Sequence, residues 1–254
     1  MKNAEQDREI ELECIQEEKD LGVIIDSKLK FDSHINEKVK TANKIMGVIR
    51  RSFEHLDQES FVYLFKGLVR PHLEYANQVW NPFLKKHINL IEKVQRRATK
   101  LIPGMKELTY TERLQKLKLP TLVYRRARGN MIEMYKILTG VYDKKVASFI
   151  EVRDPTENRT RGHELKIFQK GARLMIRKNA FGVRNAQLWN SLPTEAIQAK
   201  SVKSFENRLD KFWRNQAVIY DYEATFNGSE RTSKEDYVDL DIEDGDNLRP
   251  VDDL

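Results

Sequence analysis

The spacing of apolar residues constrains the fold of this chain more than any other feature. From Asp32 onward, apolar side chains recur at intervals of three and four residues, beginning with Val39, Ala42 and Met46. This is the period of an amphipathic helix that buries one face. The same period returns in residues 58–72, 87–102, 111–140 and 201–216. The sequence therefore predicts a mainly α-helical fold.

Two segments depart from the helical period. Residues 19–26, KDLGVIID, are a short β-branched run closed by Asp26 and Ser27, which predicts one buried strand followed by a turn. A single strand needs a pairing partner, and none is evident nearby in the sequence. Residues 165–193 suggest two further short strands around Lys170-Gly171, followed by a helix that carries Val183, Leu188 and Trp189. We therefore expect a small mixed α/β subdomain near the C-terminus, beside the helical bundle.

Charge and composition divide the chain into four parts. The net charge is +6 at pH 7, but residues 1–18 carry −5 and residues 221–254 carry −9, which leaves +20 on residues 19–220. Residues 151–164 lack apolar periodicity and indicate a linker or long loop. The expected parts are an acidic disordered N-terminus (1–18), a helical domain (19–150), a small C-terminal subdomain (151–217) and an acidic disordered tail (218–254).

The basic central region fits a surface that binds a polyanion, because Lys and Arg make the phosphate contacts that dominate nucleic-acid affinity. In residues 87–102 the apolar residues gather on one arc of the helix, and four cations occupy the opposite arc: Lys93, Arg96, Arg97 and Lys100. A second basic cluster follows at Arg125, Arg126 and Arg128. We expect these seven side chains to contact nucleic acid; the alternative is a solvated charged face.

One stretch contains residue types of acid–base catalysis. In GLVRPHLEYANQVWNP, residues 67–82, His72 and Glu74 are such types, but positions two apart on a helix point to different faces. No second histidine completes an H-E-x-x-H metal pattern. We therefore interpret His72 and Tyr75 as buried structural residues, and Pro71 as a helix kink or a helix start.

The sequence holds no pattern typical of a cofactor, metal or small-molecule substrate site. The single cysteine, Cys14, excludes a disulfide framework, and the histidines lack ligand spacing. Gly-rich phosphate loops and nucleophile elbows are missing. No apolar run reaches the roughly 18 residues that span a bilayer. The expectation is a nuclear or cytoplasmic protein that binds no cofactor and no membrane.

Five blocks of sequence occur in a characteristic order. They are KDLGVIIDSKLKFDSHI, LFKGLVRPHLEYANQVWNP, IEKVQRRATKLI, ERLQKLKLPTLVYRRARGNMIEMYKIL, and the combination of RGHELKIFQK, RKNAFGVRNAQLWNSLP and SVKSFENRLDKFW. Together they resemble the C-terminal portion of reverse transcriptases from non-LTR retrotransposons of the LINE, jockey or CR1-like type, over about Lys19 to Trp213. The resemblance implies that LGVIID is a strand of the palm. It also implies that the helices are a thumb and a C-terminal extension, which grip an RNA or RNA–DNA duplex.

The resemblance also indicates what the chain lacks. The family's fingers and palm, with metal-binding aspartates in a Tyr/Phe-x-Asp-Asp motif, should precede Lys19, where only 18 residues stand. Nucleotidyl transfer needs carboxylates around two metal ions. The expectation is a retrotransposon-derived fragment that binds template–primer and has no polymerase activity of its own. One alternative is a helical protein–protein interaction module whose basic surface recruits an acidic partner, and another is a pseudogene product.

Overall fold

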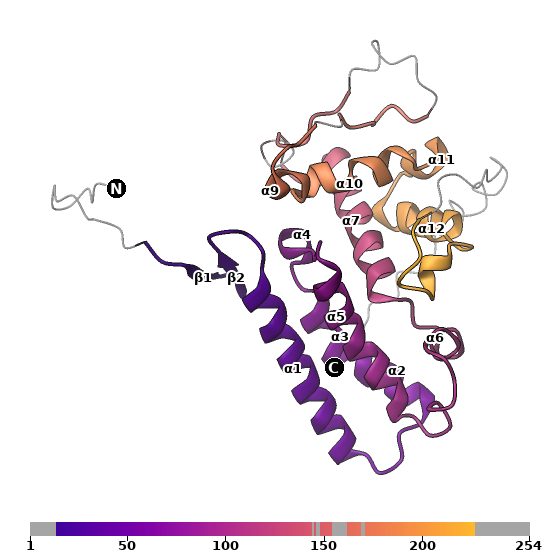
Figure 1. Cartoon of the computed structure of the whole chain (residues 1–254). Coiled ribbons are helices and arrows are strands. Elements are labelled where there is room, and N and C mark those ends of the chain that lie inside the picture. The colour runs from indigo at the N-terminus through magenta and orange to yellow at the C-terminus, as the bar shows by residue number, and fades with distance from the viewer. Residues whose placement is uncertain (1–13, 144, 146–147, 154–161, 169–170, 227–254) are drawn as a thin grey trace.

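The computed structural model describes residues 14–143, 145, 148–153, 162–168 and 171–226, and it is mainly helical, as predicted (Figure 1). In the first half, the helices are α1 (Asp32–Ser52), α2 (Gln58–Leu64), α3 (Arg70–Glu74), α4 (Asn77–Trp80), α5 (Lys85–Ala98) and α6 (Tyr110–Leu117). In the second half they are α7 (Leu122–Leu138), α9 (Met175–Lys178), α10 (Phe181–Asn190), α11 (Thr194–Ile197) and α12 (Val202–Phe212). A π-helical segment spans Phe65–Val69, and 3-10 turns span Thr99–Leu101 and Ala217–Ile219.

A β-hairpin precedes the helices. Strand β1 (Glu17–Asp20) pairs antiparallel with β2 (Val23–Asp26), so the prediction of a single strand over 19–26 is wrong. The turn residues Leu21 and Gly22 both have positive φ, 43° and 80°, as the two-residue turns of twisted hairpins require. The sequence did not indicate β1 as the partner of β2, because β1 begins at Glu17, inside the segment assigned to the acidic N-terminus.

The first core cluster is built around α1, which packs against α3, α5 and β2 (Figure 1). The largest side chains buried in it are Phe61, Phe65 and Trp80. Ile91 of α5 and Leu114 of α6 complete it from the other side. This cluster holds α5 in a fixed position and leaves one face of that helix outside the core.

Pro71, predicted at a helix kink or a helix start, is the second residue of α3 and directly follows the π-helical segment that interrupts the regular α-helix. Proline has no N–H and its ring clashes with the carbonyl four residues earlier, which explains why the regular α-helix is interrupted here. The prediction that Tyr75 is buried is wrong: its side chain is 55% exposed, and its hydroxyl donates to the Leu21 carbonyl at 3.0 Å. His72 is partly buried, and Leu73 is the core residue of this helix.

The second core cluster lies around α7, α10 and α12. Its central side chains are Tyr135, Trp189, Phe205 and Trp213. The rings of Tyr135 and Phe205 are stacked, with their centres 4.3 Å apart. Helix α7 belongs to the range 19–150 that the sequence assigns to the first domain, yet most of its side chains pack in this second cluster. The boundary between the two core clusters therefore lies at the start of α7, between Leu122 and Tyr124.

The expected mixed α/β subdomain contains little β-structure in the part of the chain that the structure describes. Val152 and Ile167 form an isolated antiparallel bridge. The second strand expected after Lys170-Gly171 is wrong, because Met175–Lys178 is helical. Helices α10, α11 and α12 supply the rest of this region.

The acidic tail was expected to begin at residue 218, but residues 218–226 pack against the second cluster and α6. Val218 is fully buried, and its carbonyl accepts a hydrogen bond of 2.6 Å from the Thr121 hydroxyl. The Ile219 carbonyl accepts another, of 2.8 Å, from the Thr121 backbone N–H. Phe226 packs on Trp213, with ring centres 4.6 Å apart. The apolar residues Val218, Ile219 and Phe226 explain why this segment packs against the protein, which its net charge alone did not indicate.

Candidate nucleic-acid interface

Helix α5 buries the apolar arc that its sequence predicts. Ile91, Val94 and Ala98 are at most 2% exposed and pack in the first cluster, with α1 on one side and α7 on another. The helix therefore has a fixed orientation, in which the arc opposite these three residues faces away from the core.

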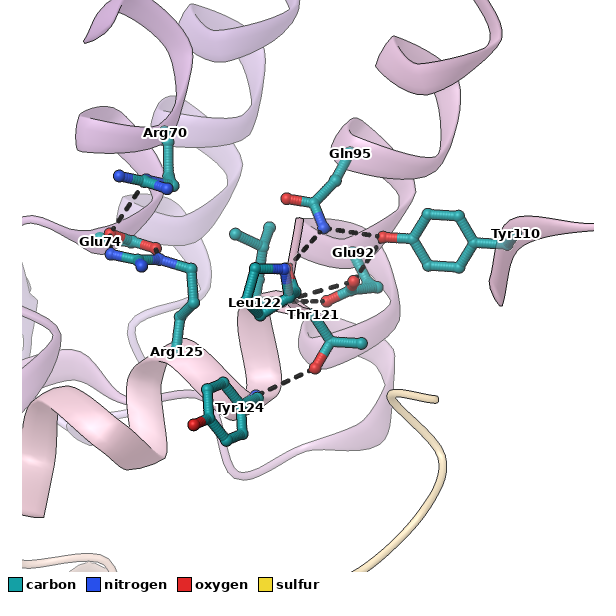
Figure 2. Close-up of polar contacts among 10 residues, drawn as sticks. Arg70, Glu74, Glu92, Gln95, Tyr110, Thr121, Leu122, Tyr124 and Arg125 are labelled. Carbon is teal, nitrogen blue, oxygen red and sulfur yellow. Dashed lines mark hydrogen bonds and ion pairs between the residues drawn. The ribbon is translucent and has the colours of Figure 1, made fainter. Parts of the chain in front are cut away.

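Helix α5 also buries the polar residues His87, Glu92 and Gln95, which the helical projection did not indicate. Figure 2 shows the contacts of Glu92 and Gln95. The Glu92 carboxylate accepts hydrogen bonds from the Tyr110 hydroxyl at 2.5 Å and from the Leu122 backbone N–H at 3.1 Å. Gln95 donates to the Pro120 carbonyl at 3.0 Å. Burial raises the pKa of Glu92. These contacts join α5 to the start of α6 and the start of α7.

Three of the four cations predicted on the helix over residues 87–102 form an exposed row, which we call the α5 ridge: Lys93 and Arg97 on α5, and Lys100 in the 3-10 turn directly after it. Within residues 14–143, 145, 148–153, 162–168 and 171–226, none of these three side chains forms an ion pair with a carboxylate. Their charges are therefore uncompensated by described neighbours and are accessible from solvent.

Arg96 has a different environment from the ridge. Its guanidinium lies 5.2 Å from the ring centre of Tyr110 and 5.0 Å from that of Tyr222, which is cation–π geometry. Its Nε is buried without a hydrogen-bond partner. Arg96 therefore holds the segment after α12 against α5 and α6, and it does not extend the exposed row.

The second basic cluster is not brought together by the fold. Arg125 donates to the Glu74 carboxylate from Nε and, at 2.9 Å, from Nη2 (Figure 2). Arg70 Nε lies 3.6 Å from the same carboxylate. Arg128 binds both oxygens of Asp210, at 2.5 and 2.8 Å. Arg126 is only 4% exposed. The charges of Arg125 and Arg128 are thus already matched by carboxylates, and Arg126 lies inside the molecule.

Lys100 also lines a cavity of about 400 Å³ together with two cations that the sequence analysis missed, Arg50 at the end of α1 and Lys106 after the 3-10 turn. Glu54 is the acidic residue in its wall. The signal available in the sequence was the pair Arg50-Arg51 at the end of the first helical pattern. Only the fold shows that Arg50 lies beside residue 100, because α1 and α5 pack side by side.

The described residues contain no group of three or more His, Cys, Asp or Glu side chains that could hold a metal ion. Among the same residues, no helix is both long enough and apolar enough to cross a membrane. Glu74, one of the two candidate acid–base residues, is engaged by Arg70 and Arg125.

This chain is thus a mainly helical protein with a basic ridge on one helix, and comparison with known proteins adds a partial relationship. No protein-family model and no solved structure matches it. Over 108 residues, 40% of this chain, it is 28% identical to the probable RNA-directed DNA polymerase from the transposon X-element of Drosophila melanogaster, of which this region is 12%. Over 126 residues, 48% of this chain, it is 26% identical to an uncharacterized protein of Caenorhabditis elegans, of which it spans 64%. The chain therefore spans less than two thirds of each of these relatives and is partly similar to a transposon reverse transcriptase.

Proposed function

We propose that this chain binds the sugar–phosphate backbone of RNA or an RNA–DNA duplex through the α5 ridge, as a helical part derived from the thumb of a LINE-type retrotransposon polymerase. The observation that carries the proposal is the row of three exposed, unpaired cations on a helix whose other face is fixed in the core. The partial similarity to a transposon polymerase supports the choice of nucleic acid as the polyanion.

The dimensions of the ridge suit a phosphate backbone. At about 1.5 Å per residue, the span from Lys93 to Lys100 is about 10 Å. Along one strand of double-stranded DNA the phosphates lie about 3.4 Å apart along the axis, so about three phosphates of that strand face a row of that length. Arg50 and Lys106 extend the positive surface beyond Lys100. Cations that contact only phosphates make no contact with the base edges, so we expect binding that does not depend on the nucleotide sequence.

The salt dependence of binding tests this proposal. The triple variant Lys93→Gln, Arg97→Gln and Lys100→Gln should lower the slope of log affinity against log salt concentration by about three, since each phosphate contact releases about one counterion. The measurement is a titration of RNA–DNA duplex at three or more salt concentrations. Circular dichroism checks the fold, which glutamine should preserve because it is a good helix former.

A matched control removes three exposed cations elsewhere on the molecule: Lys178, Lys200 and Arg214, each changed to Gln. This variant has the same net charge as the ridge variant, so a general effect of net charge would appear in both. We expect its salt slope to stay close to that of the original chain. Equal slopes in the folded ridge variant and the original chain would contradict the proposal.

A second candidate function is binding of a protein partner without a role in nucleic-acid binding. The observation in its favour is the exposure of Leu174, Met175 and Ile176, which are 71%, 56% and 53% exposed and line an apolar groove of about 650 Å³. The same titration separates the two functions. A protein-binding module should show weak duplex binding that does not depend on the ridge.

A further inference from the structure

A small cavity with both polar and apolar residues in its wall lies where the loop between α4 and α5 meets α7 and α10. Its volume is about 240 Å³. The polar residues of its wall are Asn81, Arg126, Asn130, Asn179, Arg184 and Asn185. Two of these six are arginines, and no carboxylate lines the cavity. The cavity therefore has a positive wall without an internal counter-ion.

Arg126 lacks a partner for its charge. Its side chain is 4% exposed, and its Nη1 is buried with no hydrogen bond. Glu92 and Glu74 are the acidic groups that act on it through space. Neither carboxylate forms an ion pair with Arg126 among the described residues. Glu92 instead accepts hydrogen bonds from Tyr110 and Leu122. Glu74 accepts hydrogen bonds from Arg125. An unpaired buried charge is unfavourable, so a ligand that supplies the opposite charge would stabilise this site.

Arg184 is oriented by neutral groups alone. Its Nη1 donates to the Asn179 carbonyl at 2.8 Å, and its Nη2 donates to the Gln78 carbonyl at 2.6 Å. Its Nε is buried without a partner. Burial lowers the pKa of Arg184 to about 10, so the guanidinium keeps its charge at neutral pH. The carbonyl contacts fix the direction of this cation and leave its charge uncompensated.

The amides of the wall add an unused acceptor. Asn130 Nδ2 donates to Asn185 Oδ1 at 3.3 Å, and Asn185 Nδ2 donates to the Phe181 carbonyl at 2.9 Å. This arrangement leaves Asn130 Oδ1 buried with no hydrogen-bond donor. A ligand that pairs with both arginines and with Asn130 therefore needs a negative charge for the two guanidinium groups and a hydroxyl that donates to Asn130 Oδ1.

Inorganic phosphate has this combination at neutral pH, since it keeps at least one hydroxyl and carries negative charge on several strong acceptor oxygens. A phosphate monoester has it in its singly protonated form. Arginine is the residue best suited to phosphate, because its planar donors match two phosphate oxygens. At about 30 Å³ for each water, the cavity holds about eight waters, enough room for a phosphate group that displaces some of them. We propose that this cavity binds a phosphate group, with Arg126 and Arg184 as the charged contacts. The proposal is independent of the α5 ridge.

Thermal melting with inorganic phosphate tests the proposal. A ligand that binds only the native state raises the melting temperature, because it stabilises that state by RT ln(1 + [L]/Kd). We expect phosphate to raise the melting temperature of the chain above that in potassium chloride of equal ionic strength. Calorimetric titration with phosphate should show at least a tenfold weaker affinity for Arg126→Gln. Arg214→Gln, which removes an exposed arginine outside both the cavity and the ridge, should keep the full phosphate response.

A second variant covers the case in which Arg126→Gln does not fold. Asn130→Asp places a carboxylate in the wall, where it supplies the missing negative charge. It should melt at a higher temperature than the original chain in chloride and should lose the phosphate response. Equal melting of the original chain in phosphate and chloride would overturn the proposal, and so would a full phosphate response in Asn130→Asp.

The source of the phosphate group is decided with two oligonucleotides of one sequence, one with a 5′-phosphate and one with a 5′-hydroxyl. Tighter binding of the phosphorylated strand, lost in Arg126→Gln and reduced by free phosphate, assigns the cavity to a nucleic-acid end. Equal binding of the two strands, together with the melting response to phosphate, assigns it to the free ion. The ridge variant should lower the salt slope for both strands equally and leave the difference between them unchanged, so failure of this proposal is distinct from failure of the ridge.

Discussion

Glu74 shows how a residue type associated with catalysis can serve the packing of helices. Its side chain is 19% exposed and lies between Arg70 of its own helix and Arg125 of α7. A bidentate arginine–carboxylate pair fixes both distance and angle between the two groups. In this position the carboxylate ties α3 to the start of α7, and its charge is shared between two cations.

Glu92 predicts a dependence of stability on pH. Burial raises the pKa of this carboxyl above its ordinary value of 4.5. A raised carboxyl pKa favours the native state below the unfolded pKa, and this contribution is lost as the pH rises through the folded pKa. Glu92→Gln removes the titration. Relative to the original chain, the variant should therefore gain unfolding free energy above pH 4.5, by at most about 1.4 kcal/mol per pH unit.

Urea unfolding of both proteins between pH 4 and pH 8 measures this difference. Glu107→Gln, which neutralises an exposed carboxylate on the loop before α6, is the control, and its stability should follow that of the original chain. A difference between Glu92→Gln and the original chain that stays constant with pH would contradict a raised pKa for Glu92.

The sequence indicates the exposed residues of the candidate site more reliably than the paired ones. Lys93, Arg97 and Lys100 face solvent because the helical period alone decides their direction. The pairing of Arg125 with Glu74, 51 positions away, depends on how α3 meets α7. No local pattern contains that information, so a row of arginines in the sequence did not predict a row of free charges.

At the scale of elements, periodicity predicted the helices and missed the contacts that place them. Helix α5 has the predicted apolar arc, yet Glu92 and Gln95 beside it are buried as well. They are tolerated there because Tyr110 of α6, Leu122 of α7 and Pro120 between the two helices supply hydrogen-bond partners. The hairpin was missed for a related reason: Leu21 has positive φ, which is uncommon for a non-glycine residue and gives no turn signal in the sequence.

The hairpin turn predicts a stabilising substitution. Leu21 has φ of 43° and a side chain that is 84% exposed, so it carries backbone strain and contributes little burial. Asparagine adopts this conformation more readily, and Asn-Gly is the preferred pair for such turns. Leu21→Asn should raise the unfolding free energy by about 0.5–1 kcal/mol. Thermal melting measures the change.

Leu21→Ala is the control for this substitution, because alanine also removes the exposed leucine but retains the penalty of positive φ. We expect its melting temperature to stay near that of the original chain. The hydrogen bond from Tyr75 should persist in both variants, since it is accepted by the backbone carbonyl of residue 21. A lower melting temperature for Leu21→Asn than for Leu21→Ala would show that the turn has a different conformation.

At the scale of the whole molecule, the segment after α12 connects the two core clusters. Val218 and Ile219 bind Thr121 at the start of α7, and Tyr222 covers Arg96 on α5. Residues 227–254 follow this segment and contain ten acidic and three basic residues, a net charge of −7. The packed segment and the acidic segment are adjacent in sequence, but we expect them to affect stability and binding separately.

Two truncated chains test this separation. Ending the chain at residue 226 removes the net charge of −7 and keeps every contact described above. Its melting temperature should stay unchanged, and its affinity for RNA–DNA duplex should increase at low salt, because less negative charge opposes the phosphate backbone. The increase should shrink as salt concentration rises, since salt screens charges that are not in contact.

Ending the chain at residue 216 should lower stability, because it also removes Val218, which is fully buried, and the two carbonyls that bind Thr121. Burial of one valine stabilises by about 1.5–3 kcal/mol, so a loss of at least about 2 kcal/mol is expected. Equal melting of the chains ending at 216 and 226 would contradict the packing of this segment. If affinity is the same with and without residues 227–254 at low salt, the acidic residues do not act on the duplex-binding surface, and the ridge alone then determines the electrostatics of binding.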